Sequence, residues 1–192
     1  PLAPQLLVEF HGHPEALAED LRRFHDIAMS HGAMGVQSAD NPEDRTRLWA
    51  ARHAAYRAIL ASRPGARAVV TDVCVPLSAL AVAVEETRAD IAASGIKGPI
   101  LGHVGDGNFH AILLVDPADA GEVATAKSLA ARMAERALRL GGTITGEHGV
   151  GFGKLGLMPA EHGAALGVMA ALKHALDPLG LMNPGKMLPG QP

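Results

Sequence analysis

The sequence contains few of the residues that mark several large classes of protein. Its 192 residues include one cysteine, Cys74, so neither an internal disulfide nor a multi-cysteine metal site can form. Only 3% of the residues are aromatic and the net charge is -3, which argues against a base-stacking or strongly basic nucleic-acid surface. No apolar run is long enough to cross a bilayer. Hydrophobic residues still make up 48% of the chain, a proportion typical of a globular protein with its own core.

The beginning of the chain is typical of an internal position in a longer protein. Residues 1–5 include neither an initiator methionine nor the basic segment that opens a signal peptide, and a strand-like run follows at residues 6–10. We therefore expect residues 1–192 to be one domain cut from a longer chain, without a second independent domain inside it.

Apolar periodicity and breaker residues predict alternating strands and helices. A short connection ending in Asp106-Gly107 is a strong signal for a hairpin between the last two predicted strands. A hairpin in mid-chain favours an antiparallel sheet, so we predict an α+β, ferredoxin-like fold with helices packed on the sheet and a helical C-terminal tail. The expected strands are residues 6–10, 34–36, 68–75, 98–103 and 108–115, and the expected helices are about 15–30, 42–61, 80–94, 117–140 and 159–176.

Two glycine-rich stretches contain most of the side chains capable of chemistry: residues 102–110 (GHVGDGNFH) and 146–151 (GEHGVG). His103 and His110 flank the predicted hairpin turn, where both rings are able to face one ion, and Glu147 would add a carboxylate oxygen. Two histidines and one carboxylate suit Zn, Mn or Fe. The alternative is that the histidines form ordinary hydrogen bonds in the sheet and that Glu147 is a solvated loop residue.

His148 and Arg52 are further candidates, each with a simpler alternative. His148 directly follows Glu147, and a neutral imidazole beside a metal-bound hydroxyl is a suitable general base. It would otherwise be a loop histidine bonded to the backbone. Arg52 is able to hold a substrate carboxylate through two parallel hydrogen bonds, although most helix arginines simply face solvent. Residues 149–154 (GVGFGK) lack the spacing of a phosphate loop, and Leu155 stands where serine or threonine is required.

Five segments carry a more specific signal than any single motif: residues 48–52 (LWAAR), 71–76 (TDVCVP), 102–116, 145–154 and 181–186 (LMNPGK). In this order they strongly resemble the C-terminal, substrate-side domain of FAD-linked oxidases that act on D-2-hydroxy acids. The likeness is greatest to cytochrome-type D-lactate dehydrogenases and to the FAD subunit of glycolate oxidase. The segments span nearly the whole chain, so the resemblance does not depend on one short pattern.

The resemblance implies a metal and a base at the two glycine-rich stretches. His103, His110 and Glu147 resemble the family's divalent-metal ligands, and the ion binds the hydroxyl and the carboxylate of the substrate. His148 resembles the base that takes the hydroxyl proton while hydride passes to flavin N5.

The resemblance also implies contacts with the substrate and with the flavin. Arg52 resembles the clamp for the substrate carboxylate, and Asn108 is expected to bind substrate beside it. Asn183 and Lys186 are expected to contact the flavin, because they belong to a tail that returns toward it.

Two positions favour a small substrate. In relatives that act on D-2-hydroxyglutarate, an asparagine follows the His110 position by two residues and a lysine precedes the Asp72 position by two. This sequence has Ile112 and Val70 at those places. A second substrate carboxylate would find fewer partners here, which favours a monocarboxylic acid such as lactate or glycolate.

The family binds FAD mainly through an N-terminal domain to which nothing in this sequence corresponds. We therefore expect the chain alone to bind FAD poorly and to be inactive. The expected partners are the small hydroxy acid, an unidentified electron acceptor, and either a second copy or the subunits of an oxidase complex, but no nucleic acid. The expected location is the cytoplasm or the inner-membrane surface. Two other classes remain open from ligand types alone: a metal-dependent hydrolase and a noncatalytic ferredoxin-like binding domain.

Overall fold

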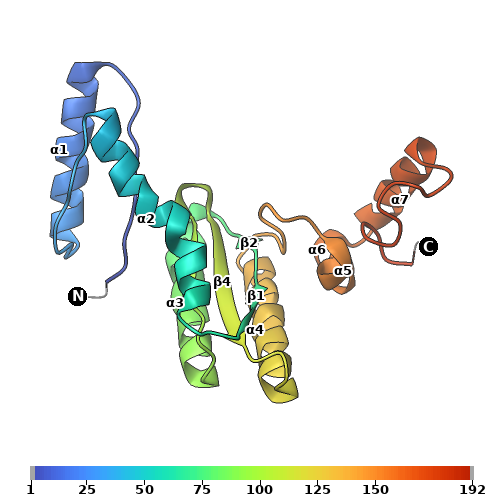
Figure 1. Cartoon of the computed structure of the whole chain (residues 1–192). Helices are drawn as coiled ribbons and strands as arrows, with labels where there is room; N and C mark the ends of the chain where they lie inside the picture. The colour runs from blue at the N-terminus through green and yellow to red at the C-terminus, as the bar shows by residue number, and fades with distance from the viewer. Residues whose placement is uncertain (1–2, 191–192) are drawn as a thin grey trace. The chain divides into compact units, whose positions relative to one another are not determined.

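The computed structural model describes residues 3–190, which divide into two compact units, one ending at Ala58 and one beginning at Ile59 (Figure 1). The first unit contains helix α1 (Pro14–Ser30) and most of helix α2 (Pro42–Ala61), both where the sequence predicts them. The Asn41 side chain accepts the Asp44 backbone N–H at 2.8 Å, so the cap predicted for α2 is present.

The two strands predicted in the first unit are wrong. Residues 6–10 and 34–36 form no strand, because neither run pairs its backbone N–H and C=O groups with a neighbouring strand. The apolar side chains of the first run serve a different purpose: the Phe10 ring packs edge-on against Phe24 of α1, with centroids 5.7 Å apart. Phe10 therefore packs on a helix, whereas Leu6 and Val8 of the same run remain exposed.

The second unit is built on an antiparallel sheet with β4 (Asn108–Val115) at its centre. On one side β4 pairs with β1 (Arg67–Val70) and β2 (Val73–Cys74), which share one register and together occupy the predicted strand 68–75. On the other side β4 pairs with β3 (Ile100–His103), which confirms the hairpin. The turn between them is a short 3-10 helix, η1 (Val104–Asp106).

An isolated bridge at Thr143 supplies the last strand position of the predicted topology. Cys74 and Thr143 exchange two backbone hydrogen bonds, at 2.8 and 3.2 Å, as an isolated antiparallel bridge. The bridge follows helix α4 (Ala120–Arg139) in the chain, so the unit runs strand, helix, two strands, helix and bridge. This is the βαββαβ arrangement of a ferredoxin-like fold, and the predicted α+β class is confirmed.

Helices α3 (Leu77–Ser94) and α4 lie alongside the sheet and cover one of its faces (Figure 1). Because side chains alternate along a strand, Phe109, Ala111 and Leu113 point into the core that these helices close. The intervening residues, including Asn108 and His110, point to the opposite face. All eight residues of β4 are buried, so both faces of the central strand are covered.

The C-terminal segment is helical, as expected, but more broken than predicted. The helix predicted over residues 159–176 divides at Gly163, which adopts a positive φ of 49°. The segment contains α5 (Gly151–Lys154), η2 (Leu155–Leu157), α6 (Met158–His162) and α7 (Ala165–Leu176). A second apolar cluster holds it against α4 and consists of Ala134, Ile144, Met158 and Leu188. Among the residues described, no helix is long and apolar enough to span a membrane.

Candidate active site

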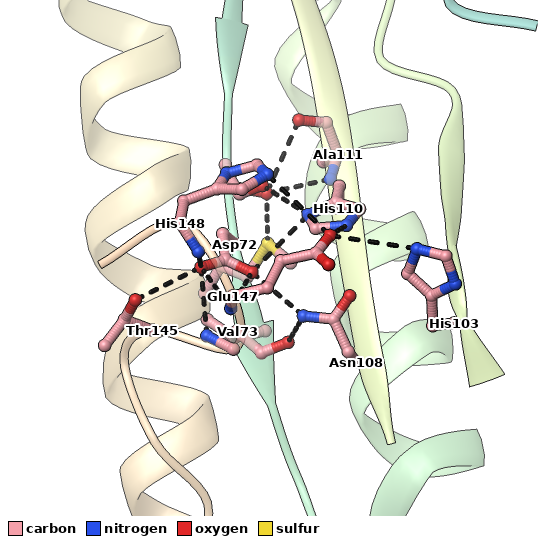
Figure 2. Close-up of polar contacts among 12 residues, drawn as sticks. Asp72, Val73, His103, Asn108, His110, Ala111, Thr145, Glu147 and His148 are labelled. Carbon is pink, nitrogen blue, oxygen red and sulfur yellow. Dashed lines mark hydrogen bonds and ion pairs between the residues drawn. The ribbon is translucent and has the colours of Figure 1, made fainter. Parts of the chain in front are cut away.

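The two glycine-rich stretches of the sequence meet at the face of β4 that α3 and α4 leave free. Figure 2 shows the side chains of His103, His110, Glu147 and His148 gathered at this place. His103 ends β3 and His110 lies on β4, whereas Glu147 and His148 belong to the loop that follows the Thr143 bridge. The loop thus brings residues about 40 positions further along the chain onto the hairpin.

The buried carboxylate of Asp72 holds this loop, although no local pattern in the sequence marks this residue as part of a site. It accepts hydrogen bonds from the backbone N–H groups of Gly146, Glu147 and His148, the last at 3.0 Å. Side-chain donors complete the set, and they are Thr145 Oγ1 at 3.3 Å, Asn108 Nδ2 at 2.9 Å and Lys154 Nζ at 3.1 Å. Asp72 is 2% exposed, so its charge is balanced by these donors and not by water.

The donors also determine the charge state of Asp72. Burial by itself would raise the pKa of this carboxyl, because it disfavours the charged form. The hydrogen bonds from the His148 N–H, the Asn108 amide and the Lys154 ammonium outweigh burial and hold the pKa well below its usual range. Asp72 is therefore a carboxylate, and it acts as the anion around which successive N–H groups converge.

The sheet is distorted beside Asp72 in a way that orients His110. The Thr71 carbonyl accepts a hydrogen bond from His110 Nδ1 at 3.0 Å, and the Thr71 hydroxyl accepts the Ala111 N–H at 2.8 Å. This exchange interrupts the ladder between β1 and β2, although the register continues across the gap. Because a carbonyl only accepts, His110 carries a proton on Nδ1, and in the neutral ring the lone pair lies on Nε2.

Three imidazoles surround one oxygen of Glu147. Oε1 lies 2.9 Å from His110 Nε2, 3.8 Å from His148 Nε2 and 3.9 Å from His103 Nε2. In the neutral ring of His110 the nitrogen that faces Oε1 carries a lone pair, so a proton or a cation must lie between these two acceptors. The donor set of two or three imidazoles and a carboxylate fits a divalent metal ion.

The cluster has a buried side and an open side. His110 is 4% exposed, whereas the side chains of His103, Glu147 and His148 are each about half exposed. The opening is a cleft of about 400 Å³ lined by Cys74, His103, Asp106, Asn108, Gly146 and Glu147. A small molecule is thus able to reach the carboxylate and two of the imidazoles from solvent.

Asp72, His110 and His148 also bring one potential ligand atom each to within 4.8 Å of one another. Asp72 is nevertheless poorly suited to be a metal ligand, because donors already occupy both of its oxygens and one of them is the Lys154 ammonium. The carboxylate that remains open to an ion is that of Glu147. The set predicted from the sequence, His103, His110 and Glu147, shares only His110 with this group.

Asn108 has an unpaired acceptor in the site. Its Nδ2 donates to Asp72 Oδ1 and to the Val73 carbonyl at 3.0 Å, and both partners only accept, so the amide cannot be reversed. Its Oδ1 is buried and has no hydrogen-bond partner. A buried acceptor left unpaired costs free energy, which a ligand that donates a hydrogen bond would recover.

Of the remaining predicted residues, Asn183 and Lys186 lie outside this cluster, in the C-terminal segment. Arg52 is on α2 in the first unit, where its side chain is half-buried. Asn183 has a positive φ of 50°, and the Lys186 ammonium lies 5.6 Å from the centre of the Phe152 ring. Within residues 3–190 no hydrogen bond or ion pair joins Asn183 or Lys186 to His103, His110 or His148.

Comparison with known proteins assigns the family. The chain matches the model for FAD linked oxidases, C-terminal domain, over residues 2–187. It is 47% identical over 97% of its length to a probable mitochondrial D-lactate dehydrogenase of Danio rerio, and 39% identical over 97% to a mitochondrial D-lactate dehydrogenase (cytochrome) of Arabidopsis thaliana. It is 34% identical over 96% to glycolate oxidase subunit GlcD of Escherichia coli strain K12. The chain therefore belongs to the family of C-terminal domains of FAD-linked oxidases.

The family assignment confirms the resemblance that the five sequence segments indicate. The chain spans only 38%, 33% and 37% of the length of these three relatives. The activities in their names belong to proteins of more than twice its length.

Proposed function

We propose that this chain forms the hydroxy-acid side of the active site of an FAD-linked oxidoreductase. The reaction is the oxidation of a small D-2-hydroxy acid, D-lactate or glycolate, to the 2-oxo acid. The observation that carries the proposal is the contact between His110 Nε2 and Glu147 Oε1 at 2.9 Å, in a ring whose Nδ1 proton is held by the Thr71 carbonyl. That pair is preorganised for a cation within reach of a solvent-open cleft.

His103, His110 and Glu147 would hold the divalent cation. His110 is the fixed ligand, because its buried ring cannot turn without losing the bond to Thr71. The more exposed His103 adjusts from the end of β3. When bound, the cation supplies a Lewis acid that favours deprotonation of the substrate hydroxyl.

Oxidation of an alcohol removes a proton from oxygen and a hydride from carbon. His148 is the proposed proton acceptor, because its half-exposed ring lies beside Glu147 and its backbone N–H is anchored to Asp72. FAD, held mainly by a part of the protein outside this chain, supplies the hydride acceptor. Asn183 and Lys186 are proposed to contact it from the C-terminal segment.

Asn108 and Arg52 are the proposed substrate-binding residues. The unpaired Oδ1 of Asn108 offers an acceptor for a hydrogen-bond donor such as the substrate hydroxyl. Arg52 would bind the substrate carboxylate through paired hydrogen bonds.

The size of the substrate is proposed from the neighbours of His110. Ile112 lies two residues further along the same face of β4, and Val70 is its direct cross-strand partner. Both side chains are apolar, so this side of the site offers no partner for a second carboxylate. The site is therefore proposed to take a monocarboxylic acid.

The proposal is tested by comparing the complete protein with the isolated chain. Flavin absorbance and reduction by D-lactate or glycolate are measured on both, with and without a chelator that removes divalent metal. The complete protein is expected to be yellow and to lose activity on chelation, and the isolated chain is expected to be colourless and inactive. A complete protein that neither contains flavin nor oxidises either acid would refute the proposal.

A further inference from the structure

The Asp72 carboxylate joins the three parts of the chain that carry the candidate ligands and base. It lies in the gap between β1 and β2, opposite His110, whose Nδ1 is 3.6 Å from Oδ1. It accepts the Asn108 amide from the start of β4. It also accepts three successive N–H groups of residues 146–148, at distances between 2.9 and 3.3 Å. One buried side chain thus links two strands and a loop.

The loop depends on this carboxylate because it has little regular structure of its own. Residues 144–150 form neither helix nor strand. Successive N–H groups that converge on one anion form a nest, and removal of the anion leaves those part-buried donors without their partner. Glu147 and His148 project from the same backbone units whose N–H groups Asp72 holds. The direction of both side chains therefore follows from the position of the carboxylate.

The fit around Asp72 leaves little room for another arrangement. A Cβ added at Gly146 would lie 1.9 Å from Asn108 Nδ2 and 2.9 Å from Asp72 Oδ1. Lys154 holds the other side, because its ammonium donates to the Asp72 backbone carbonyl at 3.0 Å as well as to the carboxylate. Only a backbone without a side chain at position 146 approaches the carboxylate this closely.

We propose that Asp72 is a positioning residue that aims Glu147, His148 and the Asn108 amide at the ligand, and so controls the metal affinity and the rate of the site. It touches neither the metal nor the substrate itself. This inference rests on the proposed function. An asparagine at position 72 has the same size, but its amide nitrogen would face donors where an oxygen is needed. Loss of the carboxylate therefore disturbs the loop without opening a cavity in the core.

The test uses the complete FAD-containing protein with Asp72→Asn, Asp72→Glu and Asp90→Asn. Asp90 of α3 is the matched control, because its carboxylate is also paired, with Arg136 at 2.5 Å, but on the helix side of the sheet. Mn²⁺ is titrated into metal-free protein, and free Mn²⁺ is measured by electron paramagnetic resonance. Flavin reduction by D-lactate or glycolate is then followed at saturating Mn²⁺ over a range of substrate concentrations.

We expect Asp72→Asn to fold, to bind Mn²⁺ about 10–100-fold more weakly, and to lower kcat more than it raises KM. Asp72→Glu retains the charge but is expected not to restore binding, because the longer side chain does not fit beside Gly146. Asp90→Asn is expected to keep wild-type Mn²⁺ affinity and kcat. Wild-type affinity and kcat in Asp72→Asn, or full rescue by Asp72→Glu, would overturn the inference and leave the proposed function intact.

Two further outcomes are distinguished by the same measurements. If Asp72→Asn does not fold, Thr145→Val and Lys154→Met remove one donor each, and both are expected to weaken Mn²⁺ binding several-fold. Wild-type Mn²⁺ affinity in both of these variants would overturn the inference. If the wild-type protein binds neither Mn²⁺ nor Zn²⁺, the proposed metal site is refuted, and the role of Asp72 is refuted with it.

Discussion

The imidazole rings of His110 and His148 are stacked, with their centroids 4.9 Å apart and their planes inclined by only 8°. The two rings nevertheless lie in different surroundings. His110 is buried and bonded to the Thr71 carbonyl, whereas His148 is about half exposed beside Glu147. The inner ring is thus held in place by the fold, whereas the outer ring stacked on it is open to solvent.

This difference predicts that substitution of His110 affects mainly metal affinity and that substitution of His148 affects mainly the rate of flavin reduction. His110→Ala is expected to weaken Mn²⁺ binding strongly, since it removes the ligand that we propose to be fixed. His148→Ala is expected to leave Mn²⁺ affinity close to wild type and to slow flavin reduction by roughly 10²–10⁴-fold, the usual contribution of a general base. Metal titration and stopped-flow flavin absorbance measure the two effects separately. Loss of metal from the His148 variant would instead identify that ring as a ligand.

Gly146 is predicted to be required for full stability, because the structure leaves no room for a side chain at this position. A methyl group there would meet Asn108 Nδ2 at 1.9 Å, and Gly146→Ala is expected to reduce the free energy of unfolding by about 1–3 kcal/mol, as overpacking does. Gly153→Ala is the control, because no atom lies within 4 Å of its added Cβ and alanine favours the helix α5. Urea unfolding of both variants checks the difference. Equal stability would show that the loop shifts without cost.

Substrate size is predicted to depend on the cross-strand pair Val70 and Ile112. The double variant Val70→Lys with Ile112→Asn is expected to raise kcat/KM for D-2-hydroxyglutarate relative to D-lactate by roughly 10–100-fold. The reason is that a hydrogen bond to a charged group contributes about 1.5–3 kcal/mol. Val70→Met with Ile112→Leu, which adds no donor, is the control and is expected to leave the ratio unchanged. A ratio equally unchanged in the first variant would contradict the assignment of this side of the site.

The C-terminal segment is predicted to contain an acid-sensitive anchor at Asp177. The Lys173 ammonium and the backbone N–H groups of Met182 and Leu181 lower the pKa of Asp177 from 3.8 to about 2. A lowered folded-state pKa means that the stabilisation is complete above about 3.8 and is lost as the pH falls through about 2. A carbon-13 titration of the carboxyl is expected to show a midpoint near 2.

A matched variant isolates the contribution of Asp177. Asp177→Asn is expected to increase amide hydrogen exchange at Leu181 and Met182 already at neutral pH, and to abolish the further change between pH 4 and 2. A carboxyl that titrates at its ordinary value in the wild type would show that the anchor does not form in solution.

Local patterns predicted most of the second unit. The apolar run within residues 108–115, the Asp106-Gly107 turn and the spacing of apolar residues before Gly95 are short-range signals, and each element formed where it was expected. Residues 6–10 have the same apolar character but lack a partner strand. Their failure to form a strand shows that strand formation depends on contacts that a local pattern does not contain.

The amino-acid sequence by itself determined most elements of the second unit and which side chains are available for chemistry, including His103, His110 and Glu147. The tertiary structure alone decided how these side chains are oriented toward one another. The Thr71 carbonyl accepts a hydrogen bond from the His110 ring instead of one from the neighbouring strand. The Asp72 carboxylate accepts hydrogen bonds from the N–H groups of a loop more than 70 residues further along the chain. The physical reason is that buried polar groups must find partners wherever the fold brings them, and no local periodicity records such a pairing.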